Sequence, residues 1–69
     1  MFGLLTSHAS TVRENTVIAA ERGANGKCRV VIRTAGVKTW VREEPTEMRC
    51  RSRFEQVVVA HEEGMALPL

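Results

Sequence analysis

The sequence predicts an α+β fold in which a three-stranded antiparallel meander carries helices on its apolar face. Three runs, at about 27–34, 37–43 and 47–52, alternate apolar with charged side chains, as strands do. Two flanking runs, at about 12–22 and 53–63, place apolar residues at helical spacing. The 69 residues suffice for a single small domain over 1–69.

The first helix is predicted from its boundary signals. Residues Thr11 to Glu14 match a capping box, and Gly23 is suitably placed to end a helix. The β-branched run within 16–22 and the hairpin signal Asn25-Gly26 favour a first strand instead. That alternative, which stays open, gives an all-β four-stranded meander or a small barrel.

Two turns connect the predicted strands. Ala35-Gly36 suits a two-residue hairpin loop, and Pro45 suits the second position of a β-turn. If the first hairpin has no bulge, Arg33 lies opposite Lys38 and Trp40 lies opposite Val31, with Arg29 facing Arg42. The third strand would likewise set Arg51 against Trp40.

The last helix is predicted from a second capping box, Ser52 to Glu55, followed by an apolar stripe. Against it stands the β-branched run 57–59, which favours a longer third strand. With both helices on the sheet, the predicted core contains Val12, Ala19, Ala20, Cys28, Val30, Ile32, Val37, Val41, Met48, Cys50, Phe54, Val57 and Val58.

The second set of side chains on the three strands is mostly basic. Arginine outnumbers lysine eight to two, and all eight acidic residues are glutamates. Guanidinium groups suit phosphates and carboxylates, and a tryptophan can stack on a base. The predicted anion-binding residues are Arg29, Arg33, Lys38, Trp40, Arg42, Arg49, Arg51 and Arg53.

We therefore expect a small non-catalytic binding protein whose basic sheet face docks an anionic partner, with nucleic acid preferred. An acidic protein surface is the other anionic partner that would fit. The alternative is a protein–protein module, such as an adaptor, an inhibitor or a small component of an assembly such as a phage particle. A simpler interpretation is that nearby glutamates neutralise the arginines and that the basic face is merely solvated.

Both ends of the chain are apolar, at 1–5 and 65–69. They pack on the core or else form a dimer or docking patch. The candidate docking residues are Phe2, Leu4, Leu5, Met65, Leu67 and Leu69.

The sequence shows no pattern typical of a metal site, a cofactor site or a catalytic site. Its two cysteines and two histidines lack the close spacing of zinc ligands. No aspartate is present to orient a histidine, and no glycine-rich phosphate loop occurs. We expect no enzyme activity, no cofactor and no metal.

The cysteines and the first residues indicate the compartment. Cys28 and Cys50, placed on the two outer strands of the predicted meander, would lie about 9.5 Å apart, too far for a disulfide. Free, buried thiols in a reducing compartment are expected. Residues 1–10 lack the features of a signal peptide, and no segment approaches a membrane span. A cytoplasmic location without membrane contact is expected.

Overall fold

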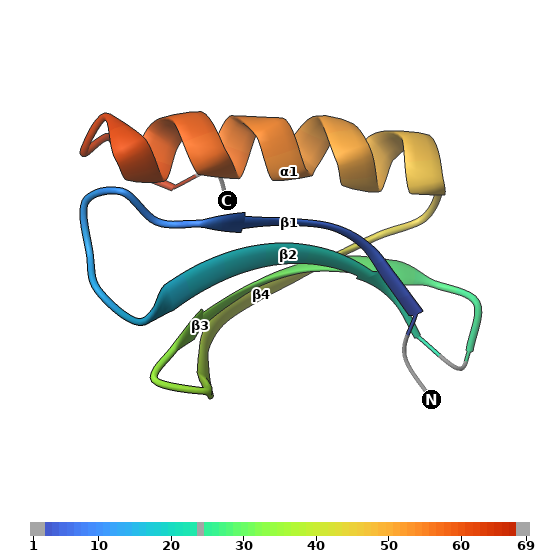
Figure 1. Ribbon diagram of the computed structural model, residues 1–69. Coiled ribbons are helices and arrows are strands. Elements are labelled where there is room, and N and C mark those ends of the chain that lie inside the picture. The colour runs from blue at the N-terminus through green and yellow to red at the C-terminus, as the bar shows by residue number, and fades with distance from the viewer. Residues whose placement is uncertain (1–2, 24, 68–69) are drawn as a thin grey trace.

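The computed structural model describes residues 3–23 and 25–67. It is an α+β fold, with a four-stranded antiparallel sheet in the order β1-β2-β3-β4 packed against one C-terminal helix, α1 (Figure 1). The elements are β1 Gly3–Ala9, β2 Thr16–Arg22, β3 Cys28–Thr34, β4 Val37–Glu44 and α1 Glu47–Glu62.

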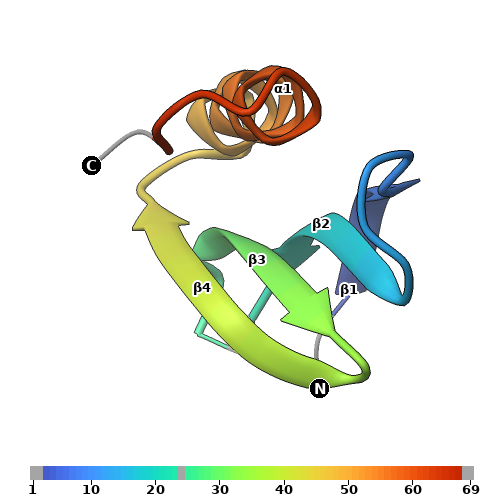
Figure 2. The same ribbon diagram turned by 90° about the vertical axis from the view of Figure 1, so that its left-hand side faces the viewer.

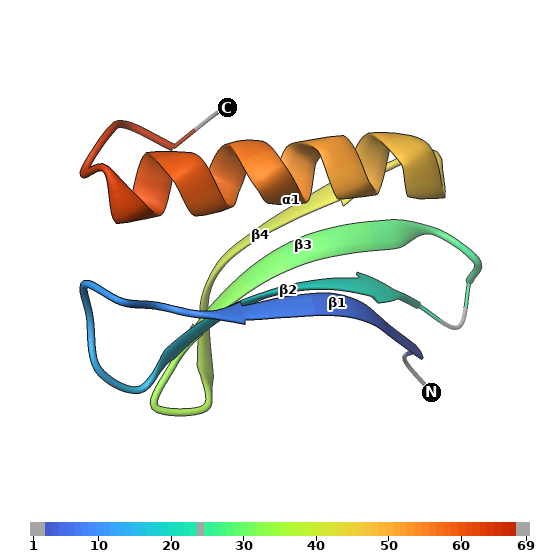
Figure 3. The same ribbon diagram turned by 45° about the horizontal axis from the view of Figure 1, so that its top comes forward.

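The helix lies along one face of the sheet in every view (Figures 1 and 3). Seen along the helix, the four strands follow one another across a curved sheet, with β1 and β4 at its two edges (Figure 2). No segment of the described chain packs against the opposite face, which we call the open face.

The predicted helix at 12–22 is wrong, and the strand alternative for 16–22 is correct. β2 pairs in register with β3 from Thr16 opposite Thr34 to Arg22 opposite Cys28. The β-branched start of β2 favours a strand, and a central strand also satisfies both backbone edges through its neighbours. The expected capping box is not formed, and Thr11 and Arg13 lie in the loop before β2.

Gly3–Ala9, which includes the described part of the apolar end at 1–5, forms the edge strand β1. Its register with β2 shifts between Leu4 and Thr6, which marks a bulge. Leu5 is half-buried and packs against the core. One half-buried anchor and six paired residues therefore suffice to extend the sheet by a fourth strand.

The hairpin between β3 and β4 has the expected two-residue loop, with Thr34 opposite Val37. Ala35 and Gly36 both have positive φ, at 52° and 80°. This is the geometry of a type I′ turn, whose twist matches that of the strands. The loop was predicted correctly, although the register beyond it was not.

The third strand predicted at 47–52 is wrong, because the helix already begins at Glu47. Thr46 is the N-cap, and its hydroxyl accepts a hydrogen bond from the Arg49 amide at 3.2 Å. Glu47 lies in the first turn, where the helix dipole favours an acid. The predicted capping box at Ser52 lies inside the helix, and the buried stripe extends one turn earlier, to Cys50.

The core lies between the helix and the inner face of the sheet. The predicted core members Ala20, Cys28, Val30, Ile32, Cys50 and Val57 are buried there, and Phe54 and Val58 are half-buried against them. Ile18 and Ala60 are buried as well and were missed. The predicted member Ala19 is buried on the opposite face of the sheet, where it pairs with Val31, another buried residue that was missed. The prediction is wrong for Val12, Val37, Val41 and Met48, all of which are exposed.

In the described part of the chain, no helix has the length and apolar character needed to span a lipid bilayer.

Candidate functional site

The structure divides the eight predicted anion-binding residues among three surfaces. Arg29 and Arg33 alternate with Cys28, Val30 and Ile32 on β3, so they lie on the open face. Lys38 lies opposite Arg33 and shares that face. Trp40 and Arg42 lie on the helix side of β4, while Arg49, Arg51 and Arg53 belong to α1.

A bulge in the β3–β4 hairpin causes the first part of this division. The register shifts between Ile32 and Arg33, so that Trp40 lies opposite Ile32 and not opposite Val31. A one-residue slip moves every following side chain to the other face of a sheet. Trp40 consequently packs, half-buried, against the core. The single basic face with a central tryptophan is therefore not formed.

The two arginines of the open face, Arg29 and Arg33, are paired with Glu21. Arg33 Nη1 lies 2.8 Å from one oxygen of the Glu21 carboxylate, and Arg29 Nε lies 3.5 Å from the other. Burial raises the pKa of Glu21, but hydrogen bonds and charges from Arg33 and Arg29 outweigh this effect and leave its pKa below the usual value.

Val31 lies between Arg29 and Arg33 on β3, opposite Ala19 on β2 and Val41 on β4, and is fully buried although no helix covers this face.

A second group of charges lies where β4 meets α1. Glu44 is almost fully buried, and its carboxylate accepts hydrogen bonds from Arg42 Nε at 3.0 Å and Arg53 Nε at 3.3 Å. Arg49 lies one helical turn before Arg53, and no carboxylate of the described residues is within ion-pair distance of it. We call Trp40, Arg42, Glu44, Arg49 and Arg53 the β4 corner.

The β4 corner has a surplus of positive charge, with three guanidinium groups for one carboxylate. A shallow depression of about 190 Å³ adjoins it, lined by Glu44, Met48, Arg49, Ser52, Arg53 and Gln56. Four of the eight predicted residues, Trp40, Arg42, Arg49 and Arg53, are therefore on or next to one surface. Arg51 points elsewhere and pairs with Glu47 at 3.2 Å.

At the far end of the helix, side chains of α1 hold the β1–β2 loop. Glu62 accepts hydrogen bonds from His8 Nε2 at 2.9 Å, from the Thr11 amide at 3.0 Å and from the Thr11 hydroxyl. The hydrogen bonds from Thr11, with a further one from His8, lower the pKa of Glu62 to about 2. Local sequence signals could not find this cluster, because its partners are more than 50 residues apart.

The Ser10 hydroxyl lies 2.8 Å from His61 Nε2, at the distance expected of a nucleophile and its base. The same oxygen accepts hydrogen bonds from the amides of Val12 at 3.2 Å and Arg13 at 3.0 Å. The Ser10 hydroxyl oxygen therefore accepts hydrogen bonds that hold the β1–β2 loop. No carboxylate of residues 3–23 and 25–67 contacts His61 to orient it as a base. This contact fastens the loop to the helix.

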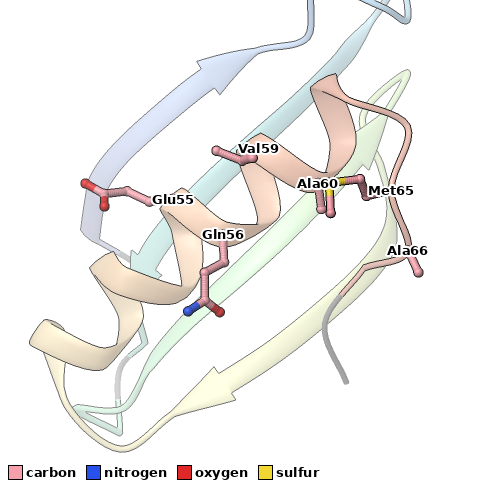
Figure 4. A pocket seen from close by; sticks show the side chains of 6 residues that line it. All are labelled: Glu55, Gln56, Val59, Ala60, Met65 and Ala66. Atoms are coloured by element: carbon pink, nitrogen blue, oxygen red, sulfur yellow. The ribbon is translucent and has the colours of Figure 1, made fainter.

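The apolar ends behave in two ways. Leu5 and Leu67 pack, half-buried, against the core, whereas Leu4 and Met65 are exposed. Phe2 and Leu69 lie outside the described residues. Met65 folds back toward Ala60 beside a shallow groove of about 450 Å³, lined by Glu55, Gln56, Val59, Ala60, Met65 and Ala66 (Figure 4).

Cys28 and Cys50 are free and buried, as expected, but the expected geometry is wrong. Cys50 lies on α1 and contacts Cys28 across the interface of helix and sheet. Burial and the neighbouring Cys28 raise the pKa of Cys50 to about 11. In the described part of the chain, no three histidine, cysteine or acidic side chains gather in a way that could bind a metal ion.

Comparison of the chain with protein-family models, with curated proteins and with solved structures finds no match. Its function must therefore be inferred from its own residues and their geometry.

Proposed function

We propose that this chain is a small non-catalytic protein-interaction module that binds its partner through the outer edge of β4. One observation supports the proposal most strongly. β4 is an edge strand that pairs with β3 alone in the described part of the chain, and it combines its free backbone edge with exposed Val37 and Val41 and half-buried Trp40. An exposed strand edge accepts an extended strand from a partner, and tryptophan is enriched among the residues that dominate binding energy.

The distribution of charge supports a protein partner over a polyanion. The arginines of the open face are satisfied by Glu21, and Arg22 and Arg51 both pair with Glu47. Cations that already have partners release few counterions when a polyanion binds. The two buried free thiols suit a reducing compartment, so we propose a cytoplasmic site of action.

Site-specific photo-crosslinking in the native host tests this function. A photoreactive residue at Val41, on the β4 edge, should give a discrete adduct with a protein. The matched control is Val17, which lies on the open face of the interior strand β2 and has a similar exposure, 40% against 47%. Equal adducts at both positions, or none at position 41, would contradict the proposal.

Nucleic acid is the second candidate partner, and the β4 corner is the observation that favours it. Arg49 is unpaired among the described residues, and Trp40 is half-exposed on the same corner. Binding to duplex DNA should weaken with salt at a log–log slope of about −1 if Arg49 alone is engaged, and of about −3 if Arg42 and Arg53 leave Glu44 for phosphates. Titrating Trp40 fluorescence with short DNA and RNA at two salt concentrations measures this. Unchanged fluorescence at low salt would exclude this candidate.

A further inference from the structure

We infer that the partner at the β4 edge is a second copy of this chain, paired antiparallel so that Val41 of one copy lies opposite Val41 of the other. The inference rests on the proposed function and names its partner. A two-fold contact of this kind would join two four-stranded sheets into one continuous sheet, with both helices on the same side.

β4 is the better of the two available edges. Its only irregularity lies near its start, where the register shifts opposite Ile32 and Arg33, so Trp40–Glu44 is regular. β1 has its bulge between Leu4 and Thr6, within the strand, and is followed by the loop that Glu62 holds. Bulges hinder edge-to-edge pairing, so the regular segment of β4 is where a second strand fits.

The faces of β4 restrict the register. In a two-fold antiparallel pair, residues directly opposite each other share a face. Trp40 and Arg42 face the helix side, whereas Val41 faces away. The symmetry axis must therefore pass through a residue position and not between two residues, which leaves registers centred on 40, 41 or 42.

Charge selects among these three registers. Centring on Arg42 places two guanidinium groups directly opposite each other. Centring on Trp40 sets Arg42 level with Lys38, whose side chain the bulge places on the other face, so no favourable charge pair forms across that contact. Like charges placed opposite one another destabilise a sheet.

Centring on Val41 sets each Arg42 against the Trp40 ring of the other copy, where cation–π attraction is favourable. The same register brings Glu43 near Lys38 and Thr39 on the open face. Self-complementarity of charge thus points to one register.

The contact is small, so the association should be weak. A ladder centred on Val41 has about three regular residue pairs, over 40–42, because Thr39 lies in the bulge. It therefore buries less surface than a standard stable interface of roughly 1,600 Å². We expect a dissociation constant on the order of 10–100 µM, measured by sedimentation equilibrium of the full chain.

A charge exchange at Val41 tests the two-fold pairing. V41K and V41E should each be monomeric, because two like charges would meet at the axis. An equimolar mixture should recover the dimer, because lysine then faces glutamate. V17K and V17E, on β2 in the sheet interior, should dimerise as the unsubstituted chain does. Circular dichroism verifies that all four variants are folded.

A cysteine scan tests the register. V41C should form an intermolecular disulfide on mild oxidation, since opposed Cα atoms lie about 4.5–5.5 Å apart in an antiparallel pair. V37C should not, since its two copies would be separated by about eight residues, or about 27 Å.

The outcomes separate this inference from the function on which it rests. A chain that remains monomeric up to about 1 mM, or a mixture of V41K and V41E that fails to associate, overturns the second copy as partner. If position 41 nevertheless crosslinks to a different protein, the proposed function stands. If it crosslinks to nothing, both fail.

Discussion

The two edge strands differ in how their side chains are used. β1 is largely polar at its end, and the loop that follows it is bound to α1 through Glu62 and His61. β4 presents Trp40 and Val41 beside a backbone edge that no other described strand pairs, and Glu44 joins its end to α1 through Arg53. One edge is thus secured within the chain, and the other retains apolar groups that the chain does not cover.

A partner can bind without loss of the fold where the groups it contacts are not already hydrogen-bonded within the chain. Groups that are already hydrogen-bonded would have to give up those bonds to meet a partner, and this opposes binding. Half-buried aromatic and exposed aliphatic groups contribute favourable burial of apolar surface when a partner covers them, and they lose no hydrogen bond. The β4 edge is therefore available for a partner, whereas the β1 loop mainly stabilises the monomer.

The largest expected effect comes from Trp40→Ala. Trp40 packs against the core from the edge strand, so its removal should lower the free energy of unfolding by about 2–3 kcal/mol and also weaken association. Trp40→Phe should retain most of the stability. Because Trp40 is the only tryptophan, urea unfolding should be followed by circular dichroism. A loss of binding with full stability would mean that Trp40 serves the partner alone.

Glu44→Gln should cost about 2 kcal/mol, because two arginines lose the carboxylate that neutralises them in a partly buried site. The matched control is Glu43→Gln on the adjacent, exposed position, which should leave the unfolding free energy nearly unchanged. Thermal unfolding of both variants gives the comparison. Equal shifts would show that the β4 corner contributes no specific stability.

Alkaline pH should lower the free energy of unfolding through the buried thiol of Cys50. The pKa of Cys50 is raised from 9.0 to about 11 in the folded chain, so the unfolded chain loses its thiol proton first as pH rises. Stability should therefore fall between about pH 9 and 11, by up to about 2–3 kcal/mol. Denaturant titrations of the unsubstituted chain and Cys50→Ala measure this, and an identical pH dependence in both would contradict the assignment.

Acidic pH should lower the free energy of unfolding through Glu62, near the C-terminal end of α1. Glu62 has its pKa lowered to about 2, so its contribution is present above its ordinary pKa of 4.5 and disappears as pH falls toward 2. Glu62→Gln should remove this component of acid sensitivity, whereas the exposed neighbour Glu63→Gln should not. Thermal unfolding between pH 2 and 6 measures this smallest effect. If both variants follow the unsubstituted chain, Glu62 does not stabilise the loop.

The sequence alone determined the fold class and the local signals. The positive-φ loop Ala35-Gly36, the alternation of β3 and the apolar stripe of the last helix can be interpreted from neighbouring residues, because turn geometry and side-chain periodicity are local properties. Four of the eight predicted anion-binding residues, Trp40, Arg42, Arg49 and Arg53, lie at the β4 corner. The prediction that these residues bind nucleic acid stays a prediction.

The state of two segments, the face on which Trp40 lies and the long-range contacts depend on the tertiary structure. Whether 16–22 and 47–52 become strand or helix depends on which surface buries their apolar side chains, and both patterns suited either state. The face on which Trp40 lies depends on one bulged residue in a hairpin. The contacts of Glu62 and His61 join segments more than 50 residues apart. Register and long-range contacts arise from packing over the whole chain, and local sequence patterns do not contain that information.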